Sequence, residues 1–261
     1  MTSRAGVLCL GLALLLAAAA EAAAPLPAHP PEVLRQDLEF LLRTIDEVHP
    51  DPYQAVSRED LEAHVQRIAA GLTEPLTAVQ FFPRVAPLIT SLGDGHTLVS
   101  PTLDSAALEE AGIRFFPLDL LFTPSGAFVL RSSGPEEEVP AGARLLSVNG
   151  TAIEEITETL LSLASGETRD LRLAKLGVDD TFKLFLWQTY GFAGTFDIEH
   201  EHDGERAGVR LAGLLPSEIR SRRTKAATKT LELETLEDGV RLLRVRHFEV
   251  DSNDFRRFLR S

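Results

Sequence analysis

Hydrophobic residues recur every three or four positions between residues 32 and 93, the spacing of one face of an amphipathic helix. The first segment ends at His49-Pro50, because proline lacks an amide donor and disfavours helix just before it. Ser57 predicts the cap of a second helix, Thr77 and Gln80 form a capping-box pattern for a third, and Gly93 suits its end. The three predicted faces are Leu34, Leu38, Leu41, Ile45 and Val48; Leu61, Val65, Ile68 and Leu72; and Phe81, Val85, Leu88 and Leu92. These segments predict a helical bundle over residues 32–100.

The pattern then changes to short hydrophobic runs separated by glycine, proline and serine, which is typical of strands. Asn149-Gly150 and Asp203-Gly204 predict tight turns, and the second would close a hairpin. Helices are expected near 153–163 and 180–190. The expected strands are Leu98-Val99, 115–121, 127–130, 144–148, 195–202 and 206–211. Together with the bundle, this second domain, over residues 110–214, gives an α+β fold.

The last part of the chain changes character again. Residues 215–228 are polar and basic and are expected to form a linker. Residues 229–261 have the pattern of two strands around Asp238-Gly239 and a short helix with Phe255, Phe258 and Leu259 on one face. So small a unit buries too little apolar surface to close its own core. We expect 229–261 to be the incomplete start of another domain; the alternative is that it docks on the preceding one.

The first 24 residues have the composition of a secretory signal peptide. Arg4 precedes an uncharged apolar run from Val7 to Ala20, and small residues follow that suit cleavage. A membrane anchor is the alternative, but a span needs about 20 apolar residues. Cys9, the only cysteine, lies in this segment. We therefore expect an exported chain, periplasmic or extracellular, with a Pro/Ala-rich linker at 25–31, no stable membrane span after cleavage, no disulfide and no thiol nucleophile.

Composition and charge narrow the choice of partners. The net charge of −13 argues against coating nucleic acid or anionic membrane, since both need basic surfaces. The sequence has no Walker loop, no dinucleotide glycine fingerprint, no Gly-x-Ser-x-Gly elbow and no His-Glu-x-x-His. No cofactor is therefore expected.

Four histidines are candidate site residues. His96 lies between a helix end and a predicted strand, where a turn can aim an imidazole into a cleft as a general base; an ordinary exposed histidine is the alternative. His49 is expected to serve the C-terminus of the first helix. His200 and His202 would share one strand face, but no further ligand stands near them in the sequence, so no metal site is expected.

Several stretches, taken in order, resemble the tail-specific, or C-terminal-processing, serine peptidase family. Together they cover residues 32–261. The matching stretches are Asp37-Leu38 to His49-Pro50 with Tyr53; Leu92-Gly93-Asp94-Gly95-His96-Thr97; Gly142 to Gly150, which ends in Val148-Asn149-Gly150; Val240 to Val245 with Phe248; and Asp254-Phe255 to Leu259. The histidine of the Asp-Gly-His-Thr stretch favours the tricorn-like branch.

The resemblance implies a helical cap, a PDZ-like domain at 110–214 and the start of an α/β crotonase-like catalytic domain at 229–261. It implies hydrolysis of peptide bonds, with His96 as general base for a serine and a PDZ-like module that binds a chain end. No serine occupies the family's nucleophile position, so this chain by itself is expected to be inactive. The rival interpretation is a non-catalytic protein that binds peptide tails by strand addition, in a groove near Arg114, Phe115 and Phe116. A secreted scaffold without ligand is a third.

Overall fold

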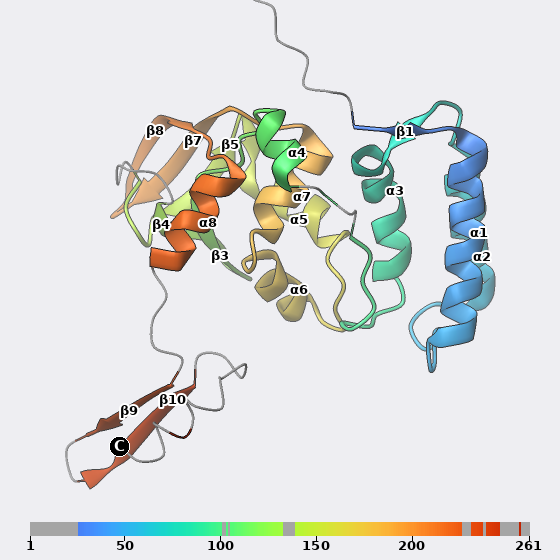
Figure 1. Cartoon of the computed structure of the whole chain (residues 1–261). Coiled ribbons are helices and arrows are strands. Elements are labelled where there is room, and N and C mark those ends of the chain that lie inside the picture. The colour runs from blue at the N-terminus through green and yellow to red at the C-terminus, as the bar shows by residue number, and fades with distance from the viewer. Residues whose placement is uncertain are drawn as a thin grey trace, which may run out of the picture. The chain divides into compact units, whose positions relative to one another are not determined.

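The computed structural model describes residues 26–100, 103, 105–132, 139–225, 231–236, 239–245 and 256. The chain divides into two compact units, Met1–Pro216 and Ser217–Ser261. The described part mixes helices with antiparallel sheets, which confirms the α+β class (Figure 1). No helix in this part is long and apolar enough to cross a membrane, and the predicted signal peptide at 1–24 lies outside it.

Three helices open the first unit: α1 (Pro31–Val48), α2 (Arg58–Ala70) and α3 (Ala78–Thr90). The predicted caps are confirmed, since Ser57 Oγ accepts from the amide of Asp60 and the capping box between Thr77 and Gln80 closes in both directions. The predicted faces form one core, with Leu41 and Phe81 partly buried. Val48 is the exception: it is 73% exposed at the last turn of α1, so its predicted inward position is wrong. Within the predicted linker at 25–31, β1 (Ala28–His29) pairs with β2 (Leu76–Thr77).

The centre of the unit is an antiparallel sheet with the strand order β3-β4-β5-β7-β8, and β6 (Thr151–Ala152) pairs with β5. Its strands are β3 (Leu118–Thr123), β4 (Gly126–Ser132), β5 (Arg144–Val148), β7 (Thr195–His202) and β8 (Glu205–Ala212). Both predicted turns have left-handed backbone at their two residues, with φ of 50° and 79° at Asn149-Gly150 and 51° and 81° at Asp203-Gly204. Leu98-Val99, predicted as a strand, forms none.

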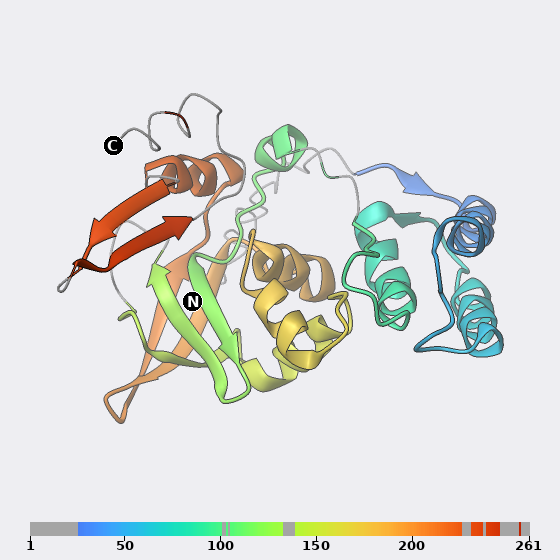
Figure 2. The ribbon, with the colours of Figure 1, turned by 90° about the horizontal axis from the view of Figure 1, so that it is seen from below.

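Helices pack beside this sheet and join it to the bundle (Figure 2). α5 (Ile153–Leu161) and α7 (Thr181–Tyr190) confirm the two predicted helices, whereas α4 (Ser105–Glu110) and α6 (Arg169–Leu176) were not predicted. The fully buried ring of Phe116 meets Phe182 and Phe196 edge to face, each at 5.3 Å between centroids. The rings of Phe82 on α3 and Phe185 on α7 lie 5.3 Å apart. One aromatic core therefore reaches from the sheet to the third helix.

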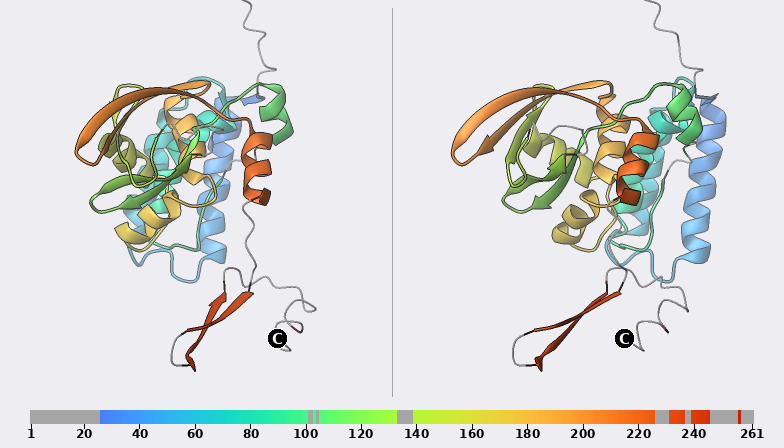
Figure 3. Two further views of the ribbon diagram at one scale, coloured as in Figure 1. Left: turned by 90° about the vertical axis from the view of Figure 1, so that its left-hand side faces the viewer. Right: turned by 60° about the vertical axis from the view of Figure 1, so that its left-hand side comes forward.

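The remaining elements are α8 (Pro216–Lys225), β9 (Leu231–Thr235) and β10 (Arg241–Val245). α8 lies within the expected linker at 215–228, which therefore contains helix, and the linker itself stays a prediction. β9 and β10 form the predicted antiparallel hairpin, with φ of 77° at Gly239 (Figure 3). The predicted helix with Phe255, Phe258 and Leu259 lies outside the described residues except at Arg256, which is helical.

Candidate active site

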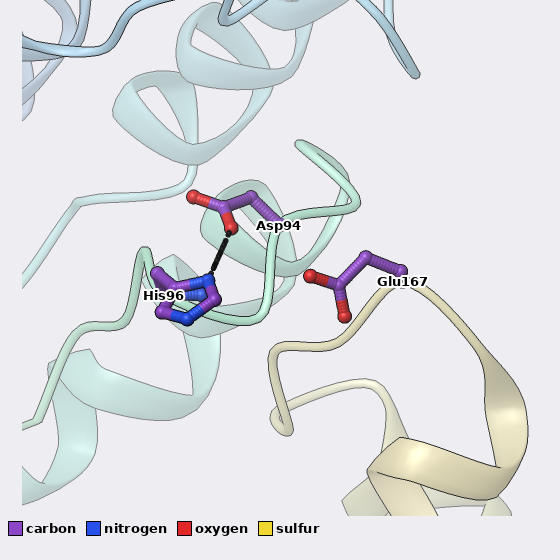
Figure 4. Close-up of side chains that lie close together, drawn as sticks. All are labelled: Asp94, His96 and Glu167. Atoms are coloured by element: carbon purple, nitrogen blue, oxygen red, sulfur yellow. Dashed lines mark hydrogen bonds and ion pairs between the residues drawn. The ribbon is translucent and has the colours of Figure 1, made fainter.

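The loop that carries His96 begins directly after α3. Gly93 has a left-handed backbone, with φ of 66°, and a Cβ there would lie 2.8 Å from Cβ of Ala55. Glycine is therefore required both by the backbone and by the space. This turn sends the chain away from the helix and presents Asp94 and His96 on one short loop (Figure 4).

Asp94 is the most heavily hydrogen-bonded group of the loop. Its Oδ2 accepts from Thr97 Oγ1 at 2.5 Å and lies 3.1 Å from His49 Nε2, and its Oδ1 accepts from the amide of His96 at 2.9 Å. The Thr97 hydroxyl, the His96 amide and His49 together hold the pKa of the Asp94 carboxyl well below its usual range, although partial burial opposes them. Asp94 is therefore ionised at neutral pH.

His49 supports this carboxylate in addition to ending α1. Its Nδ1 accepts from the amide of Asp51 at 3.2 Å, so a neutral ring carries its proton on Nε2 and donates to Asp94. Its backbone amide donates to Ile45 O at 3.0 Å and closes the last turn of α1, a bond that does not depend on the side chain, so the predicted interaction of the ring with the helix end stays a prediction. The contact with Asp94 was not predicted, because 45 positions separate the two residues.

His96 lies at the tip of the loop. Its side chain is 96% exposed, and its Nδ1 lies 3.5 Å from Asp94 Oδ1, close enough for an ion pair (Figure 4). An imidazole whose Nδ1 faces a carboxylate keeps Nε2 available for proton transfer. Among the described residues, no serine hydroxyl hydrogen-bonds to either ring nitrogen. The pair is suited to act as an oriented general base.

Two residues at the ends of α6, Glu167 just before it and Lys175 in its last turn, hold the loop at Gly95. The Gly95 amide donates to Glu167 Oε1 at 3.0 Å, and Lys175 Nζ donates to the Gly95 carbonyl. The Glu167 and Gly95 amides lower the pKa of the Glu167 carboxyl. Sequence reasoning missed both residues, since no local spacing rule connects positions more than seventy residues apart. Glu167 directly precedes Thr168, the N-cap of α6. Because α6 was not predicted, the position of Glu167 could not be predicted either.

A pocket of about 730 Å³ opens beside the loop. Val48 and Leu98, 73% and 67% exposed, are among the residues lining it. His49, Asp94, His96 and Glu167 contribute polar groups to the same pocket. The remaining lining residues are Leu41, Thr44, Ile45, Pro50, Asp51, Gln54, Ile89, Leu92, Gly93, Thr97 and Val99. The exposed imidazole therefore adjoins a largely apolar hollow of the size that binds small ligands or side chains.

The residues predicted to contact substrate lie elsewhere. Arg114 Nη1 donates to Gly213 O at 3.0 Å, and the main chain of Phe115 pairs with Leu214. The side chains of Phe115 and Phe116 are 7% and 0% exposed. None of the three lines the pocket beside His96, and a direct contact of Phe116 with a ligand would require the core to open. Their role in substrate binding stays a prediction.

Comparison with known proteins shows a likeness in fold. No family model matches the sequence, and no curated protein matches it. Two structures of CPAF, a chlamydial serine protease, superpose with a TM-score of 0.53: a serine-to-alanine mutant at 13% identity and mature CPAF complexed with lactacystin at 14%. Each match covers 82% of this chain and 47% of the CPAF chain. Neither of these two structures is of a tricorn protease, so placement in the tricorn-like branch rests on the sequence stretches alone. This chain thus has the fold of about half of the CPAF chain.

Proposed function

We propose that this chain is part of a serine peptidase that acts on peptides or proteins, and that His96 is its general base. The observation that carries the proposal is the Asp94–His96 pair, which adjoins an apolar pocket in a chain with a CPAF-like fold. A carboxylate that faces Nδ1 orients the ring and stabilises the imidazolium formed when Nε2 takes a proton. Because Asp94 is ionised at neutral pH, its negative charge can stabilise this imidazolium.

The proposed reaction is acyl transfer. His96 Nε2 removes the proton of a serine hydroxyl while the serine oxygen attacks the peptide carbonyl carbon. The imidazolium then gives this proton to the leaving amine, and a water activated by the same ring releases the acyl group. Because the chain spans 47% of the CPAF chain, we place the serine and the oxyanion donors in a segment outside residues 1–261.

The identity of the domains, the family branch and export are parts of the same proposal. The antiparallel sheet with β5, the Asn149-Gly150 turn and α5 is consistent with the PDZ-like module expected at 110–214. The β9–β10 hairpin is consistent with the start of a crotonase-like catalytic domain at 229–261. Membership of the tail-specific family rests on the five stretches taken in order, its tricorn-like branch rests on the histidine of the Asp-Gly-His-Thr stretch, and export rests on residues 1–24.

The test is peptide hydrolysis by the intact protein purified from its source cells. His96→Ala should lower kcat by about a thousandfold or more and leave KM nearly unchanged, because general-base loss acts on the chemical step. His202→Ala, which removes an imidazole on β7, is the matched control and should keep full activity. Full activity of the His96 variant would refute the proposal. Binding of peptide tails by a wild-type protein that hydrolyses none would instead favour the non-catalytic alternative.

A further inference from the structure

We propose that Asp94, His96 and Glu167 form a binding site for a divalent transition-metal ion of the zinc class, and that the bound ion switches off the general base. The first half stands on the described residues alone. The second half rests on the proposed function.

The three side chains come from two separate segments and converge at one point (Figure 4). One ligand atom from each lies within 4.8 Å of the other two. Tetrahedral zinc with ligands at about 2.1 Å places its ligand atoms roughly 3.4 Å apart. Asp94 Oδ1 and His96 Nδ1 already lie 3.5 Å apart, so the closure still needed, a shift on the order of 1 Å, is in the distances to Glu167. A fourth position would remain for water.

The two carboxylates are held in place before any ion binds. Thr97 and His49 orient Asp94, and the Gly95 amide orients Glu167. Metal sites use such outer hydrogen bonds to fix their ligands, and a pre-ordered pair lowers the entropy cost of binding. The His96 ring, which is exposed and lies against Asp94, then needs only a small adjustment to meet the ion.

The donor set favours zinc over the common hard cations. One imidazole with two carboxylates suits zinc and related transition metals, whereas magnesium and calcium prefer oxygen ligands alone. Two carboxylate charges also balance the charge of a divalent ion. Lys175 acts against binding, because its ammonium group contacts the Gly95 carbonyl between the ligands. An affinity near the micromolar range is therefore expected, weaker than that of a structural zinc site.

Metal binding and base catalysis compete for the same electron pair. A neutral imidazole has one nitrogen with a free lone pair, and its other nitrogen carries the proton. When the ion takes that lone pair, no site remains to accept the proton of a serine hydroxyl. The bound ion would thus hold the proposed enzyme inactive until a chelator or a drop in free zinc releases it.

Calorimetric titration of the full chain with Zn²⁺ near neutral pH tests the site directly. We expect one ion per chain, with affinity weakened about tenfold or more in both His96→Ala and Glu167→Gln. Glu167→Gln keeps an oxygen that can accept from the Gly95 amide, so the loop is retained. Circular dichroism and thermal melting verify that each variant folds. In the wild-type chain, the NMR signals of the His96 ring should shift on zinc addition.

The control separates this site from the histidine pair on β7. His202→Ala should leave the zinc affinity within about twofold of the wild type. Loss of binding in that control, unchanged binding in both site variants, or no binding at about 1 mM zinc would overturn the site. Since binding is measured without substrate, such a failure leaves the general-base proposal standing. Zinc that binds the site without slowing peptide hydrolysis by the intact protein would overturn the regulatory half.

Discussion

The amide of Gly95 donates a hydrogen bond to Glu167 Oε1 at 3.0 Å, although 72 positions separate the two residues. Lys175, in the last turn of α6, donates to the carbonyl of the same glycine, so both main-chain polar groups of Gly95, next to His96, are held by residues from the two ends of α6. The loop that carries His96 is therefore positioned by residues at the ends of α6, which packs on β3, as well as by the helical bundle.

Replacement of Gly95 by alanine should disturb this clamp while leaving the fold intact. A Cβ at position 95 would lie 2.8 Å from Glu167 Oε2 and 3.2 Å from Lys175 Nζ. Both atoms end flexible side chains that can move aside, so the free energy of unfolding should change by less than about 1 kcal/mol. Zinc affinity should fall about tenfold, because Glu167 leaves its position. Calorimetry and denaturant unfolding measure the two effects.

The control for this variant is Gly71→Ala. The nearest atom to a Cβ there, Ile68 O, lies 3.4 Å away, and the backbone of Gly71 is right-handed with φ of −79°. Both zinc affinity and stability should stay close to wild type. Equal zinc affinity in the Gly95 and Gly71 variants would show that the clamp does not position Glu167.

Lys183 gives a second prediction, on stability. Its side chain is only 4% exposed, and its Nζ donates to Asp119 Oδ1 at 2.5 Å and to Asp180 Oδ1 at 2.9 Å. Lys183→Ala removes a buried cation and its two charged hydrogen bonds, while Asp119 keeps its pair with Arg131, so the chain should be destabilised by about 2 kcal/mol. Arg206→Ala, which removes a 76% exposed partner of Glu201, should cost less than about 1 kcal/mol. Equal losses of unfolding free energy in Lys183→Ala and Arg206→Ala, measured by urea unfolding, would contradict this prediction.

Local chemistry explains which features could be predicted from the sequence. The caps at Ser57 and Thr77 and the turn at Asn149-Gly150 depend on residues within three positions, so their signatures lie in short stretches of sequence. α6 and α8 were missed because they are short and polar, and the 153–190 region showed two stronger apolar patterns. The loop position of His96 was predicted, but its surroundings were not. The contacts of His49 with Asp94 and of Glu167 with Gly95 join distant segments, which single-sequence spacing cannot relate.

Asp119 predicts one part of the chain's acid sensitivity. Burial alone would raise the pKa of this carboxyl, but the attraction and hydrogen bond of Lys183, aided by Arg131, hold the pKa below its usual value. A depressed pKa contributes stability that is complete above the unfolded value of about 3.9 and is lost as the pH falls from that value through the lower pKa of the folded chain. Unfolding free energies measured from about pH 5 to 3 should therefore fall less steeply in Asp119→Asn than in wild type. Parallel curves for the two proteins would contradict this.

His200 predicts a loss of stability at milder pH. Its side chain is 6% exposed, and Nδ1 has no hydrogen-bond partner among the described residues. Burial, followed by repulsion from His202, lowers the pKa of the His200 ring, so the unfolded chain takes up a proton first. Its contribution to stability is complete above the unfolded pKa of about 6.5 and is lost as the pH falls below that value. His200→Leu should flatten the decline in unfolding free energy between about pH 7 and 5, whereas His29→Ala, at an exposed position on β1, should keep the wild-type slope. A wild-type slope in the His200 variant would mean that this ring takes up its proton over the same pH range in the folded and the unfolded chain, and the acid sensitivity of that range would then have to come from the other histidines.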